Sequence, residues 1–361
     1  MSAPEGGTLE IDLGALRANY RHVAREAREA RTGASVKADA YGLGAVAVAG
    51  ALATEGCRDF FVAHWSEAQA LAPSLPGDAL IFVLNGLPPG SAAEAAAMAS
   101  AVPVINSREQ AAAWAAEAHR RGHPLPAALH IDTGMSRLGL TAGEAAELPL
   151  DALSVKLVMS HLSEAEDPSA SSNSAHLAAF REAIAAFPGV PASLANGSGV
   201  LLGPDYRFDL VRPGAALYGV NPTPGHANPM RPVLRLDARV IQLRDLPAGA
   251  RVGYGGTFTA PHAMRTATIG LGYGDGWPRR AQLAEFFGGV RLPMIGRISM
   301  DTLVLDVSAL DGQALRPGDE VTLLDETQTV DSVGEAAGTI GYEVLTSLGA
   351  ARRLARRYVG E

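Results

Sequence analysis

The sequence predicts an α/β protein in which an N-terminal (β/α)8 TIM-like barrel precedes a C-terminal, mostly β domain. Up to about residue 218, short apolar runs alternate with alanine-rich stretches of helical length, which requires a parallel sheet. About eight such units fit a closed barrel better than an open sheet. A proline-rich segment at 221–232 then leads into strands with period-two alternation. We expect a barrel domain over 1–225 and a β-rich domain over 226–361.

Each predicted barrel strand ends at a polar residue. These ends are Lys37, His64, Asn85, Asn106, Asp132, His161, Asn196 and Arg212. Because the carboxyl ends of parallel barrel strands meet at one face, we expect these side chains to converge there. Helices are predicted over 107–121, with Ser107 as the amino-terminal cap and Gly122 as the stop, and over 173–187. Asn106 is interpreted as a helix cap.

The second domain is predicted from alternating segments and turns. Strands are expected over 233–241, 266–271, 302–307 and 320–324, separated by turns such as 247–249 and 316–319. The end of the chain, 342–358, returns to helical spacing. Its four arginines are interpreted as a solvated basic face near a helix carboxyl terminus.

Composition favours small-molecule chemistry in the cytoplasm. The chain has 361 residues and a net charge of -8, which argues against nucleic acid or an anionic membrane as the main partner. One cysteine, Cys57, leaves no internal disulfide, and no stretch reaches the roughly 20 apolar residues of a membrane span. The amino terminus also lacks the pattern of an export signal. We therefore expect a soluble cytoplasmic protein.

Lys37 is the most informative residue. It ends a short β-branched run and passes directly into a glycine-spaced turn, in the segment 35–44. A lysine at the end of a buried strand is costly to desolvate. It is therefore paired, neutralised by a lowered pKa, or covalently occupied as a Schiff base; a surface lysine is the alternative.

Besides 35–42, ordered motifs lie at 132–139, 160–162, 211–214, 252–255, 272–277, 297–301 and 341–343. Together these motifs resemble those of one family, the bacterial alanine racemases, which are pyridoxal 5'-phosphate (PLP) enzymes of the fold type III barrel. The resemblance covers essentially the whole chain. It implies racemisation of L- and D-alanine, with a homodimer as the working form and no metal.

The resemblance implies a base on each face of the substrate carbon, because one base cannot reach both faces. Lys37 would serve one face and Tyr254 the other. A hydrogen-bonded chain from Tyr254 to His161 to Arg212 would stabilise the tyrosine as a phenolate, whose ordinary pKa is near 10. Arg212 would also face the PLP ring nitrogen and keep it unprotonated.

The same resemblance assigns the remaining contacts. Phosphate binding is expected from Tyr41, Tyr342 and backbone N–H groups near Asn196, Gly197, Gly214 and Ala215. Arg137 and the Met300 backbone would contact the substrate carboxylate, while Tyr273 and Asp301 would line the entry. Tyr254, Tyr273, Met300 and Asp301 would reach the site of the partner subunit.

Two positions depart from the family pattern. His130 stands where many members carry a lysine, often carbamylated, whose negative charge orients the substrate-binding arginine. A histidine provides no such anion, which leaves open how Arg137 is held. Gly197 replaces a serine whose hydroxyl contacts the phosphate, and the adjacent Ser198 is a candidate substitute.

Some alternative functions remain compatible with the sequence, and individual residues argue against others. A racemase of broader range, acting for example on serine, is compatible with the sequence. A non-catalytic PLP-binding barrel generally lacks the second domain, and related decarboxylases need a cysteine late in the chain, whereas Cys57 is early. The tripeptide 132–134 is also found in aspartic proteases, so a protease is a formal alternative. The segment 161–164 could be read as a metal site, but its lone histidine with nearby carboxylates lacks a third ligand. Supply of D-alanine for peptidoglycan and its breakdown are both compatible.

Overall fold

The computed structural model describes residues 6–310 and 315–360. The chain divides into two compact units. The barrel unit comprises Leu16–Ala40 and Gly44–Met230; the sheet unit comprises residues up to Ala15, Tyr41–Leu43 and the chain from Arg231 onward. Within the described residues, no helix combines the length and apolar character needed to cross a bilayer.

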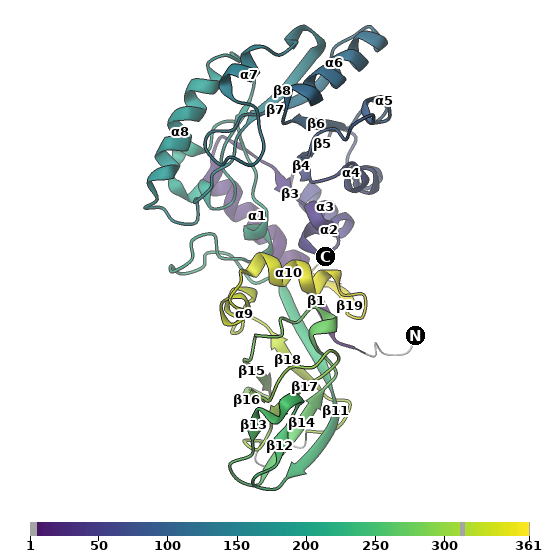
Figure 1. Cartoon of the computed structure of the whole chain (residues 1–361), viewed down its shortest axis with the longest axis vertical. Coiled ribbons are helices and arrows are strands. Elements are labelled where there is room, and N and C mark those ends of the chain that lie inside the picture. Colours follow the sequence, from purple (N-terminus) through teal and green to yellow (C-terminus); the bar gives the residue numbers. More distant parts are fainter. Residues whose placement is uncertain (1–5, 311–314, 361) are drawn as a thin grey trace. The chain divides into compact units, whose positions relative to one another are not determined.

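The barrel unit is a ring of parallel strands with helices on the outside (Figure 1). Its strands are β2 (Arg31–Thr32), β3 (Ala34–Ser35), β4 (Asp59–Val62), β5 (Leu80–Val83), β6 (Ala101–Ile105), β7 (Leu125–His130), β8 (Leu153–Met159), β9 (Ala192–Ser193) and β10 (Leu210–Val211). Its helices are α1 (Leu13–Ala27), α3 (Ala45–Thr54), α4 (Trp65–Leu71), α5 (Ala92–Ala95), α6 (Arg108–Arg121), α7 (Ala142–Ala146) and α8 (Ser171–Ile184), while the short segment α2 (Lys37–Tyr41) has left-handed φ values. Each predicted polar end lies one to three residues beyond its strand.

Backbone hydrogen bonds close the ring. Strands β3 to β9 pair in chain order, and β2 pairs with β10. The N–H of Ser35 donates to the carbonyl of Pro213 at 2.8 Å, and the N–H of Arg212 donates to that of Ala195 at 2.9 Å. Because β2 and β3 are one strand interrupted at Gly33, eight strands form the barrel, as the sequence predicts.

The barrel interior is a small apolar core. It consists of Phe61, Phe82, Val102, Val104, Ala128, Leu157, Met159 and Leu210. The rings of Phe61 and Phe82 stack with their centroids 4.9 Å apart. The guanidinium carbon of Arg212 lies 5.9 Å from the Phe61 centroid, so this cation rests on top of the core. Polar chemistry is thereby confined to the mouth.

Helix α6 begins and ends as predicted. The Ser107 hydroxyl accepts from the N–H of Gln110, and Gly122 adopts a left-handed conformation with φ of 78°. The prediction that Asn106 is a helix cap is wrong. Its Nδ2 donates to the carbonyls of Leu84 and Val104 at 2.9 and 2.8 Å, which ties β6 to the end of β5.

The sheet unit is built on one long twisted sheet, antiparallel except for one pair. Its strands are β1 (Thr8–Asp12), β11 (Leu234–Leu246), β14 (Met264–Ile269), β15 (Ala284–Phe287), β16 (Val290–Ile295), β17 (Leu303–Asp306), β18 (Glu320–Leu324) and β19 (Ala355–Val359), with a separate pair, β12 (Arg251–Val252) and β13 (Phe258–Thr259). Its helices are α9 (Val330–Ala337) and α10 (Gly341–Ala350). Strand β11 pairs with β1 and β18 at its start and with β14 at its end.

Two segments differ from the sequence prediction. Residues 8–12 were expected in the barrel domain, whereas they form β1, which pairs with β11 and β19. The expected helix over 342–358 ends at Ala350. Ala351 is extended, and Arg356 and Arg357 lie on β19, parallel to β1. The guanidinium of Arg357 pairs with Glu10, so these arginines belong to a strand and not to a helix terminus.

Candidate active site

The backbone after Lys37 makes a left-handed turn. Residues 38–41 have φ values between 53° and 56°, a conformation that L-residues other than glycine rarely adopt. Left-handed helical geometry costs roughly 1–2 kcal/mol for each such residue. The turn ends the β3 strand abruptly and places Lys37 at the barrel mouth. Surrounding contacts must therefore hold this segment in place.

Glu67 is the main tether of this turn within the barrel unit. Its Oε1 accepts from the N–H of Ala38 at 2.5 Å, while its Oε2 accepts from those of Ala63 and His64 at 2.7 and 2.9 Å. One carboxylate thus joins the turn after β3, the end of β4 and the start of α4. On the far side, Asp39 Oδ1 accepts from the first N–H of α3 at 2.7 Å.

Replacing Glu67 with Gln should destabilise the chain by about 1–2 kcal/mol, because an amide nitrogen cannot accept and at least one backbone N–H loses its partner. Chemical denaturation would measure the change. The matched control is Glu29→Gln, at an exposed carboxylate, which should alter the free energy of unfolding by less than about 0.5 kcal/mol. Equal stabilities for the two variants would contradict the tether.

The environment of Lys37 favours its neutral amine. Burial lowers the pKa of Lys37 below the ordinary lysine value, and the positive charge of Arg137 lowers it further. The carboxylate of Glu67 opposes both effects without cancelling them. A lysine of this kind is a nucleophile and a base nearer neutral pH than a solvated one.

His161 and Arg212 form the second polar pair at the mouth. Arg212 donates from Nη1 to Ser193 Oγ at 2.5 Å and from Nη2 to the Ser160 carbonyl at 2.6 Å. Its Nη2 also lies 3.4 Å from His161 Nδ1. Arginine has only donors, so His161 Nδ1 is the acceptor and the ring proton resides on Nε2. His161 can therefore donate to an external oxygen.

Charge and burial keep this pair in fixed protonation states. Burial lowers the pKa of Arg212 to about 9, so it stays a cation at neutral pH. Burial, followed by the charges of Arg212, Arg137 and Lys37, holds the pKa of His161 well below its ordinary value. The imidazole is therefore neutral at pH 7.

The backbone segments predicted to bind phosphate lie close together where β9 and β10 end. Asn196 forms an isolated parallel bridge with Arg212, and its Oδ1 accepts from the N–H of Gly199 at 2.8 Å. A Cβ on Gly197 would lie 2.8 Å from the Cβ of Ala216, so this backbone approaches too closely for a side chain. Ala216 belongs to a short 3-10 helix (Ala215–Tyr218) whose first N–H groups have no acceptor within the helix. The close backbone packing at position 197 therefore leaves no room for the serine side chain of the family pattern.

Asp132 shapes the loop that carries Arg137. Its Oδ1 accepts from the N–H groups of Gly134, Met135 and Ser136 at 2.9, 2.9 and 3.1 Å. Burial alone would raise the pKa of Asp132, but these donors hold it below its ordinary value. The carboxylate is therefore committed to the loop backbone, which argues against the protease reading of this tripeptide.

His130 is neutral and hydrogen-bonded. Burial, with Arg212 as the next cause, lowers the pKa of His130 to about 4. Its Nδ1 lies 2.8 Å from Asn106 Oδ1, so Nδ1 carries the proton. The pair supplies no anion beside Arg137. Orientation of Arg137 therefore depends on its loop.

The predicted site residues of the sheet unit differ in their exposure and in their contacts. Tyr254, Met300 and Tyr273 are 70%, 51% and 42% exposed, so these large side chains lie on the surface of the single chain. The rings of Tyr41 and Tyr342 lie 6.2 Å apart. Asp301 accepts from Arg353 Nη1 at 2.5 Å.

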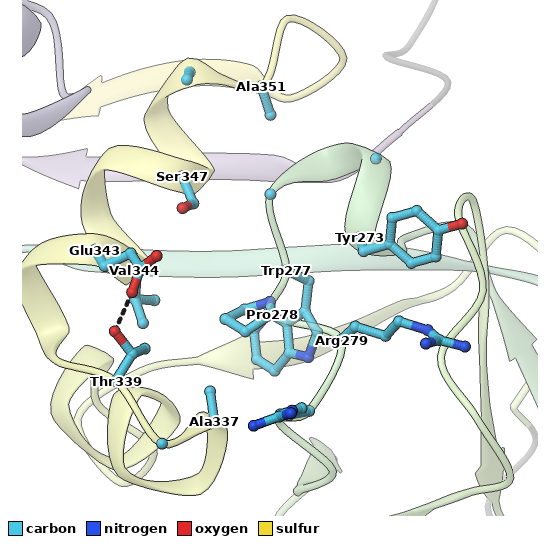
Figure 2. A pocket seen from close by; sticks show the side chains of 15 residues that line it. Tyr273, Trp277, Pro278, Arg279, Ala337, Thr339, Glu343, Val344, Ser347 and Ala351 are labelled. Carbon is cyan, nitrogen blue, oxygen red and sulfur yellow. Dashed lines mark hydrogen bonds between the residues drawn. The ribbon is translucent and has the colours of Figure 1, made fainter.

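A pocket of about 720 Å³ lies within the sheet unit, between the segment 273–280 and the α9–α10 region. Figure 2 shows Glu343, hydrogen-bonded to Thr339, on one wall and Trp277, Pro278 and Arg279 on the other. Tyr273 also lines it. Lys37, His161 and Arg212 belong to the other unit and do not line this pocket.

The structure brings together Lys37, Arg137, His161 and Arg212, whose charges affect one another. Sequence reasoning missed Glu67, although it stands three residues after the strand-end His64, a helix-start spacing that could have indicated it. It also missed Ser193, the acceptor of Arg212, and His176, which has no motif of its own.

Comparisons with known proteins identify the family of this chain. Family models described as the N-terminal and C-terminal domains of alanine racemase match residues 11–222 and 233–358. Proteins named "Alanine racemase, catabolic" from Mesorhizobium japonicum and Agrobacterium fabrum are 50% and 51% identical, over 99% and 98% of this chain and 94% and 92% of theirs. A crystal structure of the Bartonella henselae alanine racemase with covalently bound pyridoxal phosphate matches with a TM-score of 0.93 and 39% identity, over 99% of this chain and 100% of that one. The chain therefore belongs to the alanine racemase family of pyridoxal phosphate-dependent isomerases.

Proposed function

We propose that this enzyme interconverts L- and D-alanine with two bases, Lys37 and the Tyr254 of a partner subunit. The observation that carries the proposal is the half-buried Lys37 side chain, whose pKa is lowered by burial and by the charge of Arg137. An amine of lowered pKa near an arginine suits a substrate with a carboxylate next to an acidic carbon–hydrogen bond. The names of the two relatives support alanine as that substrate.

The residues at the barrel mouth fit pyridoxal phosphate. Lys37 offers the amine, the backbone at 196–197 and 214–215 offers a close-packed anion cradle, and Arg212 offers a charged donor. Within the described residues, the Nε–H of Arg212 donates no hydrogen bond, while both terminal nitrogens do. That N–H is available to the ring nitrogen. When bound, the cofactor supplies the electron sink that acidifies the substrate carbon.

Arg212 limits this electron sink. Its pKa of about 9 leaves it protonated at pH 7, so it would donate a hydrogen bond to the ring nitrogen without protonating it. The electron sink would then be weaker than with an acidic partner. Side reactions such as transamination should be restrained.

Each base handles the proton on its own face. The neutral Lys37 amine takes the proton at Nζ on one face, while a Tyr254 phenolate serves the other. His161 supports that phenolate by donating from Nε2, because Arg212 already occupies its Nδ1. Tyr254 is 70% exposed in the single chain, which supports a role at the mouth of a partner.

The other site assignments follow the family resemblance. Arg137 and the Met300 backbone bind the substrate carboxylate, and Tyr273 and Asp301 line the entry. Tyr41 and Tyr342 bind the phosphate. The 6.2 Å separation of their rings supports a shared ligand for these two tyrosines.

The physiological direction is not set by the active site, because a catalyst accelerates both directions equally and enantiomers have equal free energies. Two relatives at 50% and 51% identity are named catabolic, which supports consumption of D-alanine over the supply of a peptidoglycan precursor. The cytoplasm remains the expected compartment.

The test is the loss of circular dichroism from pure L-alanine, compared with pure D-alanine and L-serine. Wild-type enzyme should racemise both alanine enantiomers, and Tyr254→Phe should slow the reaction by about 100-fold or more. The Tyr254→Phe substitution should slow proton abstraction from one alanine enantiomer more directly than from the other. Tyr206→Phe, outside the site, is the control. Full-speed racemisation by Tyr254→Phe would refute the two-base assignment, and faster conversion of serine would favour the broader racemase.

A further inference from the structure

His176 joins two loops of the barrel mouth. It lies on α8, is 3% exposed, and uses both ring nitrogens. Its Nδ1 lies 3.1 Å from Thr133 Oγ1, and its Nε2 lies 2.9 Å from Ser163 Oγ. Thr133 follows β7, and Ser163 follows β8. One buried ring therefore sets the spacing of the two loops.

The hydrogen bonds continue to the polar pair described above. Thr133 Oγ1 lies 2.7 Å from Ser160 Oγ, and the Ser160 carbonyl accepts from Arg212 Nη2 at 2.6 Å. The chain of contacts thus runs from His176 through Thr133 and Ser160 to Arg212. All four residues belong to the barrel unit.

His176 also packs against the backbone of the Arg137 loop. Gly134 has φ of 130°, and a Cβ there would lie 3.2 Å from Cε1 of the His176 ring. The carboxylate of Asp132 accepts from the N–H groups of Gly134, Met135 and Ser136. The His176 ring and the Asp132 carboxylate both contact the loop at Gly134, three residues before Arg137.

Arg137 needs such support from its loop. Within the described residues, its side chain makes no hydrogen bond or ion pair, and its neighbour His130 is neutral. No carboxylate aims the guanidinium. Its placement is therefore set by backbone position, which increases the importance of whatever anchors Thr133 and Gly134.

We propose that His176 is a positioning residue for substrate binding. By clamping Thr133 and Ser163, it holds Arg137 where the carboxylate of the substrate binds. This inference rests on the proposed function, in which Arg137 is the carboxylate ligand.

The experiment compares His176→Ala with His176→Gln in the cofactor-loaded enzyme. The alanine variant removes both hydrogen bonds, whereas glutamine retains a donor and an acceptor. We expect His176→Ala to raise KM for alanine about 10-fold with a smaller change in kcat, and His176→Gln to recover most of the loss. His123→Ala, at an exposed histidine, should change neither parameter.

Acetate provides a readout independent of turnover. Calorimetric titration of the loaded enzyme should give an acetate Kd about 10-fold weaker in His176→Ala than in wild type. If His176→Ala does not fold, Thr133→Val and Ser163→Ala each remove one hydroxyl of the clamp and should each weaken acetate several-fold. Unchanged acetate affinity in the folded clamp variants would overturn the role of His176.

Arg137→Ala separates the two levels of inference. If Arg137→Ala weakens acetate but the clamp variants do not, only the positioning role fails. If Arg137→Ala leaves acetate affinity unchanged, the assignment of Arg137 in the proposed function fails, and the clamp loses its target with it.

Discussion

Lys37→Ala should lower racemisation by about 10⁴-fold, because in the proposed function it removes both the amine that attaches the cofactor and one of the two bases. The chain contains only two lysines, Lys37 and Lys156. Lys156 is exposed in the middle of β8, three residues before the carboxyl end of the strand. This composition makes the attachment assay unusually direct.

Borohydride reduction followed by peptide mass spectrometry would locate the cofactor. We expect one pyridoxyl group on the peptide containing Lys37 in wild-type enzyme and in the control Lys156→Arg, which should keep full activity. Attachment at Lys156, or an active Lys37→Ala enzyme, would contradict the assignment.

A mixture of two inactive chains tests the shared site within the same experiment. Combining Lys37→Ala with Tyr254→Ala places an intact Lys37 opposite an intact Tyr254 in one site of each mixed dimer. Random reassociation should restore about one quarter of the wild-type sites. Absence of rescue, with mixed dimers shown by native mass spectrometry, would exclude sites built from two subunits.

The second large effect concerns Glu285 in the sheet unit. This residue of β15 is 0% exposed, and neither carboxylate oxygen has a hydrogen-bond partner in the described residues. Burial, followed by the charge of Asp325, raises the pKa of Glu285 well above its ordinary value. The folded chain therefore retains a proton that the unfolded chain releases above about pH 4.5.

Stability should therefore fall as pH rises from the unfolded toward the folded pKa, by about 1.4 kcal/mol per pH unit. Glu285→Gln removes this titration, so the variant should gain stability relative to wild type as the pH rises above about 4.5, the ordinary pKa of a glutamate. Denaturant unfolding of the holoenzymes at several pH values measures the difference. Glu326→Gln, at an exposed carboxylate of the same unit, is the control. Parallel pH profiles for wild type and Glu285→Gln would show that the group is ionised.

The barrel was predictable because its signals are local. Each strand ends one to three residues before a polar side chain such as Asn85 or Asp132, and α6 carries its cap and stop in the sequence. The β19 strand was not predictable in this way. Its pairing with β1 joins residues 8–12 to 355–359, at opposite ends of the chain, and no local pattern encodes so distant a partner.

The residues of the candidate site divide in the same way, into those with a local sequence signal and those without one. Lys37, Arg137, His161 and Arg212 were found because each belongs to a family motif or a strand end, and the structure places them in one unit. Asn106 was misread because an asparagine before a helix can either cap that helix or hydrogen-bond to the neighbouring strands. Only the neighbouring strands, with the His130 ring at 2.8 Å, decide between capping and cross-strand bonding. Glu67 contacts Ala38, 29 residues away in sequence, in addition to its local partners Ala63 and His64. Both partners of His176 lie more than ten residues away in sequence.

The left-handed segment after Lys37 bears on any attempt to transfer this chemistry to another scaffold. Four consecutive strained residues at roughly 1–2 kcal/mol each approach the entire net stability of a small domain. A designer who grafts the lysine alone onto a foreign barrel would see the loop relax and the amine swing away. The glutamate and aspartate that restrain residues 38 and 39 must be transplanted with it.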